Sequence, residues 1–289
     1  MSHRGRVVSL IGAIIATGAA PAAAQTWRTL TMSRPMHGES TLTVDVQYGA
    51  GRFHLAPGGG RTLYRVEMSY DEERFTPIRE YDAEASVVRL GARGRDGGGV
   101  RVNFGDRRRG RQPAAFDLTL SPDVPLSLNL ELGAVESEVE LGGLALRRLT
   151  YRTGASSSTV RFSRANPVAC DDLRLEAGAA EMRVVSIANA NCAHLSFRGG
   201  VGQVNLDFSG DWRRSLDAEV EVSIGSLTLG LPRDVGVAIH VNRFLASFAA
   251  TGFTKRGQTY YTSNYNTARY RLSLQVSATI GGIDVNWIE

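Results

Sequence analysis

Helical periodicity is missing from this sequence, because no window of a dozen residues repeats its apolar positions every 3.6 residues. Long apolar runs are missing as well: after residue 20, no stretch approaches the about 20 residues that a membrane-spanning helix needs. No cysteine lies directly after the first apolar run, which argues against a lipid-modified N-terminal cysteine. Proline is scarce, with 9 residues, whereas the 32 glycines mark the ends of short alternating runs. These features favour an all-β protein with many turns.

The first 24 residues have the parts of a secretory signal peptide. Arg4 and Arg6 precede an apolar run, and Ala22 to Ala24 offer a small-residue cleavage site. We therefore expect residues 1–24 to be cleaved after Ala24, and the mature chain to be periplasmic or extracellular with no transmembrane span. Loss of the two arginines lowers the formal net charge from +4 to 31 − 29 = +2, which gives no indication of nucleic-acid binding.

Residues 25–114 have the pattern of an antiparallel β domain. Leu42, Val44 and Val46 would share one face of a strand whose other face is polar. Glycine-rich and acidic turn sequences separate several of the runs, and a charged loop from Gly105 to Arg111 ends the region. The expected strands are Leu42 to Gln47, Arg52 to Ala56, Leu63 to Ser69, Ser86 to Leu90 and Gly99 to Phe104.

Residues 115–289 contain a repeated unit of about 21 to 25 residues, and a repeat of this period indicates a solenoid. In each unit a strand leads through a glycine corner to a second strand. One such unit cannot bury its own apolar face, whereas stacked units share a continuous core. We therefore expect a single-stranded β-solenoid. Its corner glycines would be Gly133, Gly154, Gly178, Gly200, Gly225 and Gly281, and the leucines that close its units would be Leu149, Leu173, Leu195 and Leu216.

The two cysteines of the chain occupy equivalent positions in neighbouring units. Cys170 and Cys192 each lie three residues before a ladder leucine, Leu173 and Leu195. Adjacent rungs of a sheet stand about 4.8 Å apart, a separation that disulfide geometry accepts. Export would supply an oxidising compartment, so we expect a disulfide, with two free buried thiols as the alternative.

The segment from Val241 to Gly257 interrupts the repeat, because its phenylalanines and Leu245 are spaced too irregularly for a rung. A solenoid leaves unpaired strand edges at its end, and a cap over that end is the interpretation that we favour. A loop that enters a membrane or binds a partner is the alternative.

Several motifs of the chain resemble one bacterial family. They are the Gly-Ala corners at Gly133, Gly154 and Gly178, the stretches Gly200 to Gly202, Leu206 to Gly210 and Leu231 to Val237, and Val44 to Gly51 near the N-terminus. These motifs are similar to those of the toast-rack family, which includes putative adhesins and the C-terminal domain of membrane proteins that respond to cell-wall-active antibiotics. The resemblance covers nearly the whole mature chain and implies a β-solenoid without catalytic residues, with an adhesive, sensing or envelope-stress role. The family's companion N-terminal domain would correspond to the antiparallel region.

No arrangement of residues points to a metal or a cofactor. The four histidines after the signal peptide share no zinc-ligand spacing with cysteine or acidic residues, and no calcium-binding repeat of the Gly-Gly-x-Gly-x-Asp type recurs. We therefore expect no metal site and no cofactor. The histidines, which we interpret as structural, are His37, His54, His194 and His240.

Catalytic motifs are missing in the same way. Ser156 to Ser158 lack the Gly-x-Ser-x-Gly context of a nucleophile elbow, and we interpret them as a turn. Glu136, Glu138 and Glu140 alternate along one strand face, which is typical of a solvated face. We therefore expect no catalytic residues. A polysaccharide-active β-helix enzyme remains the alternative. Aspartate and arginine clustered at equivalent positions of adjacent rungs would support it, and we find no such cluster in the sequence.

Arg107, Arg108, Arg109 and Arg111 form the densest charge of the chain and are the weak candidates for ligand binding. Arginine pairs well with phosphate, so these residues could bind an anionic envelope polymer, although a solvated interdomain loop is the interpretation that we favour. The sequence as a whole predicts an exported, non-catalytic β-solenoid that acts in envelope interaction, as an adhesin-like, scaffold or stress-sensing protein. Its partners would be an envelope protein or polymer.

Overall fold

The computed structural model describes residues 26–95 and 114–289, in which every long element is a β-strand. One sheet contains the strands in the order β1-β3-β6-β2-β7-β8-β9-β10-β11-β15-β12-β14-β13, with β5 paired to β2 and β4 to β5. A 3-10 helix, Ile187–Ala190, separates β9 from β10. The strands are β1 (Trp27–Pro35), β2 (Leu42–Pro57), β3 (Thr62–Asp71), β4 (Phe75–Asp82), β5 (Val87–Gly94), β6 (Ala115–Leu120), β7 (Leu126–Glu140), β8 (Leu146–Arg161), β9 (Cys170–Val185), β10 (Cys192–Asp207), β11 (Leu216–Pro232), β12 (Gly236–Phe248), β13 (Thr254–Arg256), β14 (Thr259–Tyr261) and β15 (Arg271–Ile288).

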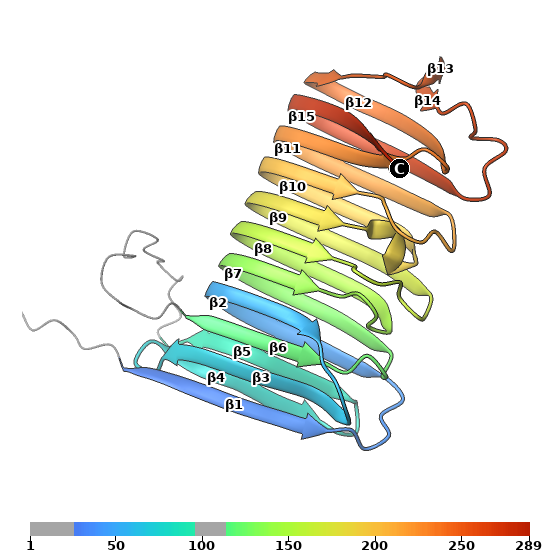
Figure 1. Cartoon of the computed structure of the whole chain (residues 1–289). Coiled ribbons are helices and arrows are strands. Elements are labelled where there is room, and N and C mark those ends of the chain that lie inside the picture. Colours follow the sequence, from blue (N-terminus) through green and yellow to red (C-terminus); the bar gives the residue numbers. More distant parts are fainter. Residues whose placement is uncertain (1–25, 96–113) are drawn as a thin grey trace, which may run out of the picture.

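The long strands are the rungs of a solenoid, and each bends back on itself near its middle (Figure 1). Neighbouring rungs pair in parallel, so that Leu173 of β9 lies between Leu149 of β8 and Leu195 of β10. Alternate side chains point inward from both arms of each bend, and they form one apolar core along the molecule. The predicted all-β solenoid is therefore confirmed.

Three of the four leucines that were predicted to stack in one ladder do so. Ala218, rather than Leu216, pairs with Leu195, while Leu216 pairs with Leu272 two residues earlier in the rung. Both Leu216 and Ala218 are buried. A shift of two residues leaves each side chain on the same face of its strand, so apolar alternation alone does not distinguish the two registers.

Glycines form two ladders at the bend where one was predicted. Gly225 pairs with Gly202 and with Gly281, and all three have a positive φ. They lie two residues further along the rung than the ladder of Gly154 and Gly178. The prediction that Gly225 and Gly281 continue that ladder is therefore wrong by two positions. In that other ladder, the backbones approach too closely for a side chain, since a Cβ on Gly178 would lie 2.8 Å from the carbonyl oxygen of Gly154.

The N-terminal region combines antiparallel and parallel pairing. The expected antiparallel pairing is present between β1 and β3, β3 and β6, and β4 and β5, although β1 and β4 were not among the predicted strands. In contrast, β2 joins two of the predicted strands into one bent strand, which pairs in parallel with β5, β6 and β7. The bend at Gly51 brings both arms of β2 into register with β7, so β2 is the first rung of the solenoid. The domain boundary at residue 114 stays a prediction.

The C-terminal end of the solenoid has a crossed strand order. β15, the last strand of the chain, lies between β11 and β12 and pairs in parallel with both. Val241 to Phe248 are therefore part of the last rung, and the prediction that this stretch is too irregular for a rung is wrong. Beyond this rung, Phe253 and Tyr260 pack against the core, and the Tyr260 ring meets Phe248 edge-on at 5.1 Å. A cap formed by the rest of the predicted segment stays a prediction.

Three predictions fall outside the described residues: the signal peptide at residues 1–24, the strand from Gly99 to Phe104, and the loop with Arg107, Arg108, Arg109 and Arg111. In residues 26–95 and 114–289, no helix has the length and apolar character needed to cross a membrane.

Candidate functional site

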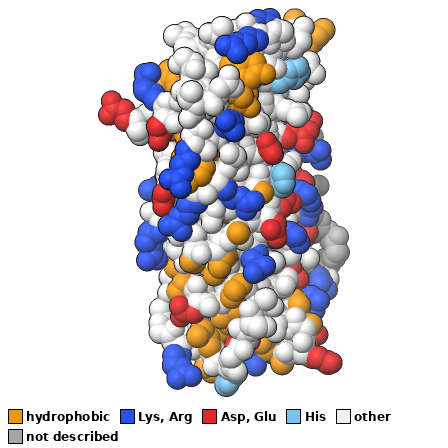
Figure 2. Space-filling view, turned by 90° about the vertical axis from the view of Figure 1, so that its right-hand side faces the viewer, with side chains coloured by type: hydrophobic (Ala, Val, Ile, Leu, Met, Phe, Trp, Pro, Cys, Tyr) orange, Lys and Arg blue, Asp and Glu red, His pale blue; other side chains and the backbone are white. Residues whose placement is uncertain are grey.

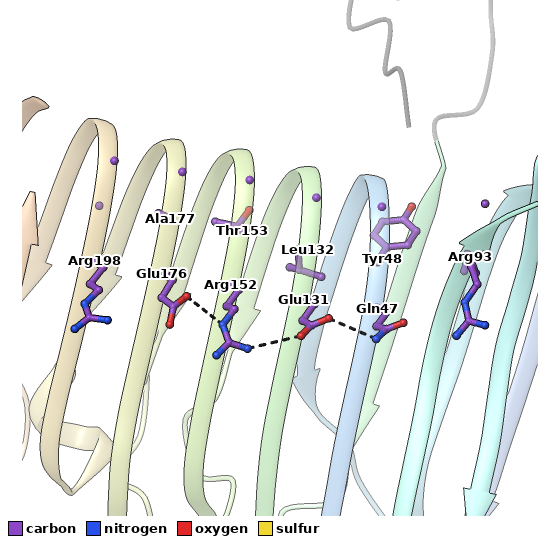
Figure 3. A pocket seen from close by; sticks show the side chains of 18 of the residues that line it. Gln47, Tyr48, Arg93, Glu131, Leu132, Arg152, Thr153, Glu176, Ala177 and Arg198 are labelled. Atoms are coloured by element: carbon purple, nitrogen blue, oxygen red, sulfur yellow. Dashed lines mark hydrogen bonds and ion pairs between the residues drawn. The ribbon is translucent and has the colours of Figure 1, made fainter. Parts of the chain in front are cut away.

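A shallow groove of about 990 Å³ crosses the rungs beside the bend. Figure 3 shows it from close by, with one charged or amide side chain contributed by each of several neighbouring rungs. Successive rungs also contribute a glycine, because the bend leaves no room for side chains there. The groove is therefore a consequence of stacking: glycines keep it open and polar side chains border it. It is lined by residues of β2, β5 and β7 to β11.

The polar border is a ladder of side chains in parallel register. Gln47 donates from Nε2 to Oε2 of Glu131 at 3.4 Å, and the Arg152 guanidinium lies between two carboxylates (Figure 3). Its Nη1 is 3.7 Å from Oε1 of Glu131, and its Nε is 3.1 Å from Oε2 of Glu176. Opposite charges directly across a strand pair stabilise pairing, whereas like charges destabilise it. The alternation of acid and base therefore supports the in-register stacking of the rungs.

The same ladder continues on the next two rungs with Arg198 and Glu221. Nε of Arg198 lies 3.3 Å from Oε2 of Glu221, and both side chains are about half exposed. The ladder thus presents donors and acceptors about every 4.8 Å, the spacing of neighbouring strands. Such a row can bind an extended polar ligand along the solenoid axis.

Hydroxyl groups and carboxylates are both present in the described lining of the groove. No histidine is among its described lining residues, so the hydroxyls of Thr153 and Ser223 have no imidazole base beside them. Two of its carboxylates, Glu131 and Glu176, both contact Arg152.

The predicted acidic face of β7 is confirmed as an outward face. Glu136 and Glu138 are exposed there, and Glu138 pairs in register with His54. Nδ1 of His54 lies 3.6 Å from Asp117 on the other side. In the part of the chain that the structure describes, no group of three or more histidine, cysteine or acidic side chains is placed to hold a metal ion.

The serine run lies in a strand, so its interpretation as a turn is wrong. Ser158 of β8 points into the core, where its hydroxyl and that of Ser137 form a 2.9 Å hydrogen bond. The Tyr151 hydroxyl shares hydrogen bonds of 2.8 Å with both. Burial raises the pKa of Tyr151, although the hydrogen bonds from the two serines act in the opposite direction. This buried cluster was not predicted, because a serine run at a bend resembles turn chemistry.

The predicted disulfide is present: Cys170 and Cys192 are bonded, with their Cα atoms 4.1 Å apart. They pair directly in the register of β9 and β10, as the equivalent spacing to Leu173 and Leu195 indicated.

Exposed apolar side chains form a stripe along the outside of the bend near the C-terminal end. Val201, Ile224, Ile280 and Leu245 follow one another in register on β10, β11, β15 and β12. Phe244, which precedes Leu245 in the chain, is the most exposed large apolar residue of the described chain, with 79 % of its surface exposed. The predicted cap includes Phe244 and Leu245, whereas both residues lie in β12, the last rung.

A second surface at the same end is basic and rich in tyrosine. Figure 2 shows blue and orange side chains together at the upper end of the molecule, which is its C-terminal end. Lys255 lies over the ring of Tyr260 at 5.3 Å and Arg256 over the ring of Tyr261 at 5.9 Å. The sequence signal that could have revealed this surface is a lack of acids: residues 235–283 contain no aspartate or glutamate.

Comparison with known proteins identifies one family. The model of the N-terminal domain of toast_rack, DUF2154, matches residues 25–185 and 167–230. No curated protein matches the chain.

The chain aligns with three solved structures over most of their length. The "putative cell adhesion protein" from Clostridium sporogenes is 17% identical with a TM-score of 0.47, and the alignment covers 91% of this chain and 100% of that one. A "putative adhesin" from Bacteroides fragilis is 10% identical with a TM-score of 0.34, covering 88% and 97%. A "putative lipid binding protein" from Parabacteroides distasonis is 9% identical with a TM-score of 0.36, covering 91% and 97%.

Proposed function

This chain belongs to the toast-rack family, and from that premise we propose that it is an exported, non-catalytic, adhesin-like protein that binds a component of the bacterial envelope through the outer surface of its solenoid. The observation that carries the proposal is the charge ladder beside the bend. Glu131, Arg152 and Glu176 are linked across three rungs, and Arg198 and Glu221 continue the row. A long polar groove of this kind suits an extended ligand.

Several observations support binding rather than turnover. The described residues of the groove contain no nucleophile with an adjacent base, and their carboxylates contact arginine. Stacked-strand proteins use their extended faces as binding surfaces, because each rung repeats the same side-chain positions. The names of two compared structures, from Clostridium sporogenes and Bacteroides fragilis, also refer to adhesion.

Export is supported by two independent features. The Cys170–Cys192 disulfide is typical of an oxidising compartment outside the cytosol. The first 24 residues have the pattern of a signal peptide. We propose a periplasmic or extracellular location on these grounds. Roles as a scaffold or as a partner in envelope-stress sensing use the same binding surface and are narrower forms of this proposal.

The experiment is co-sedimentation of the chain without residues 1–24 with purified envelope fractions, namely peptidoglycan sacculi and outer-membrane vesicles. We expect saturable binding to at least one fraction. A double variant with Arg152→Gln and Arg198→Gln removes both bases of the ladder and should weaken that binding. The matched control, Arg147→Gln and Arg183→Gln, changes two exposed arginines outside the groove. No saturable binding to either fraction would contradict the proposal, and equal effects of both variants would contradict the groove as its site.

A further inference from the structure

The surface formed by residues 254–271, between β12 and β15, has the composition of a binding site for an acidic ligand. We propose that it binds an anionic polysaccharide, one whose sugars carry carboxylate or phosphate groups. The choice of an envelope polysaccharide rests on the adhesive function proposed above. The site itself is separate from the groove and rests on its own observations.

The first observation is charge of a single sign. Residues 235–283 contain five basic residues and no acidic residue, although acids and bases are nearly equal in number over the whole chain. In the described structure, none of these five side chains forms an ion pair with a carboxylate, and all are exposed. Their charge is therefore available to an anion, and the same charge would repel a second copy of this end. Four of them, Lys255, Arg256, Arg269 and Arg271, lie within residues 254–271, and the fifth, Arg243, lies in β12.

The second observation is that four of these cations lie over tyrosine rings. Besides the pairs of Lys255 and Arg256, the guanidinium of Arg269 lies 5.1 Å from the Tyr270 ring centre and that of Arg271 lies 5.8 Å from the Tyr265 ring centre. A cation held over a ring has less freedom to lose on binding, while its N–H groups can still donate to an anion. The four pairs therefore hold four cations in place within residues 254–271.

The third observation is that the segment is fixed to the solenoid. Thr262 is buried, and its hydroxyl accepts a 2.9 Å hydrogen bond from the backbone N–H of Val237 in β12. Asn264 donates from Nδ2 to the carbonyl oxygen of Arg233 at 3.0 Å, and Arg271 donates from Nε to that of Tyr265 at 3.0 Å. An anchored surface needs little ordering when a ligand binds, which favours affinity.

The remaining side chains favour a saccharide over other polyanions. Residues 254–271 also carry threonine, serine, asparagine and glutamine, whose hydroxyls and amides can pair with sugar hydroxyls. Tyrosine adds rigid contact area that is both apolar and polar, as in antibody combining sites. A lipid surface would instead need exposed apolar residues at the site, and the most exposed ones, Phe244 and Leu245, lie at the bend, beyond the part of β12 that pairs with β14.

The test uses the chain without residues 1–24 and alginate oligosaccharides, which are linear polyuronates, in isothermal titration calorimetry. We expect the variant Lys255→Gln, Arg256→Gln, Arg269→Gln to weaken binding at least about tenfold, since three charge-assisted contacts are lost. The control variant Arg147→Gln, Arg148→Gln, Arg183→Gln removes the same charge from exposed arginines elsewhere and should bind within about twofold of the unchanged chain. Equal losses in the two variants would overturn the assignment of the site.

Two further variants and a set of alternative ligands identify the class of ligand. Tyr270→Leu keeps every charge and should still weaken alginate binding, whereas Phe244→Ser with Leu245→Ser should leave it unchanged. Neutral dextran should not bind. The assignment is overturned if Tyr270→Leu binds as the unchanged chain does, or if single-stranded DNA of matched charge or phosphatidylglycerol vesicles bind more tightly than alginate. If alginate does not bind but the chain still binds envelope fractions through the groove, this site is refuted and the adhesive function is not. The two proposals can therefore be refuted separately.

Discussion

Leu195 of β10 lies in parallel register with Leu173 of β9, and both side chains are buried in the core that runs the length of the solenoid. Leu195→Ala should therefore lower the free energy of unfolding by about 2–5 kcal/mol, through lost transfer energy and the cavity left behind. Urea unfolding measures this change. The neighbouring substitution His194→Ala, on the exposed face, should cost less than about 0.5 kcal/mol. Equal costs for the two variants would contradict the register.

The disulfide between β9 and β10 should stabilise the fold by constraining the unfolded chain. Cys170 and Cys192 are 22 residues apart, and closing a loop of this size is worth about 3 kcal/mol on the chain-entropy description. The double variant Cys170→Ala, Cys192→Ala should lose about that amount in urea unfolding. Mass spectrometry of peptides from protein alkylated without reduction checks the bond itself, and two alkylated cysteines would show that it is absent.

The second glycine ladder should tolerate no side chain. Gly225 has a φ of +136°, and a Cβ there would overlap the carbonyl oxygen of Gly202. Gly225→Ala should therefore cost at least about 2 kcal/mol, from backbone strain and displacement of the rung. Gly59→Ala is the matched control, because nothing lies within 4 Å of a Cβ at Gly59 and the expected change is within about 0.5 kcal/mol. If Gly225→Ala also changed the free energy of unfolding by less than about 0.5 kcal/mol, the rungs would not be stacked as described.

Two buried tyrosines should make the protein unstable in alkali. Burial raises the pKa of Tyr48 and of Tyr151. Unfolded tyrosine ionises near pH 10, so above that pH the unfolded chain releases protons that the folded chain retains. The stability conferred by the neutral hydroxyls is fully present below about pH 10 and is lost as the pH rises above it. Chemical unfolding at a series of pH values, with tyrosinate absorbance followed in parallel, measures the effect.

Tyr151→Phe separates this effect from general alkaline denaturation. The variant should cost about 1 kcal/mol near neutral pH, because Ser137 and Ser158 lose a partner but still bond to each other. It should then lose less stability than the unchanged protein as the pH rises above about 10. An identical alkaline loss in both proteins would show that Tyr151 does not contribute.

The features that recur from rung to rung could be predicted from the sequence. The stacking of Leu173 on Leu195 and the Cys170–Cys192 bond both followed from equal spacing, because parallel in-register rungs bring equivalent positions together. The two-residue error at Gly225 has a physical cause: the side-chain period of a strand is two, so a shift of two preserves the buried face. Only the contacts between backbones at the bend distinguish the registers.

The groove could have been predicted in part. Glu131, Arg152, Glu176 and Arg198 each lie two residues before a corner glycine, and their charges alternate in sign. The position of β15 between β11 and β12 could not be predicted in this way, because the inserted segment that follows Phe248 separates the two rungs in the sequence. Pairing of the last strand is decided by tertiary contacts rather than by local pattern.

The most direct test of a binding, non-catalytic solenoid is a single measurement on alginate and on polysaccharide released from purified envelope fractions. Each is incubated with saturating protein lacking residues 1–24, and its chain length is measured by size-exclusion chromatography with light scattering. We predict that at least one polysaccharide co-elutes with the protein and that its chain length is unchanged when the protein is removed. Shortening of the polysaccharide that a single substitution, such as Glu131→Gln or Glu176→Gln, abolishes would contradict the account and establish an enzyme.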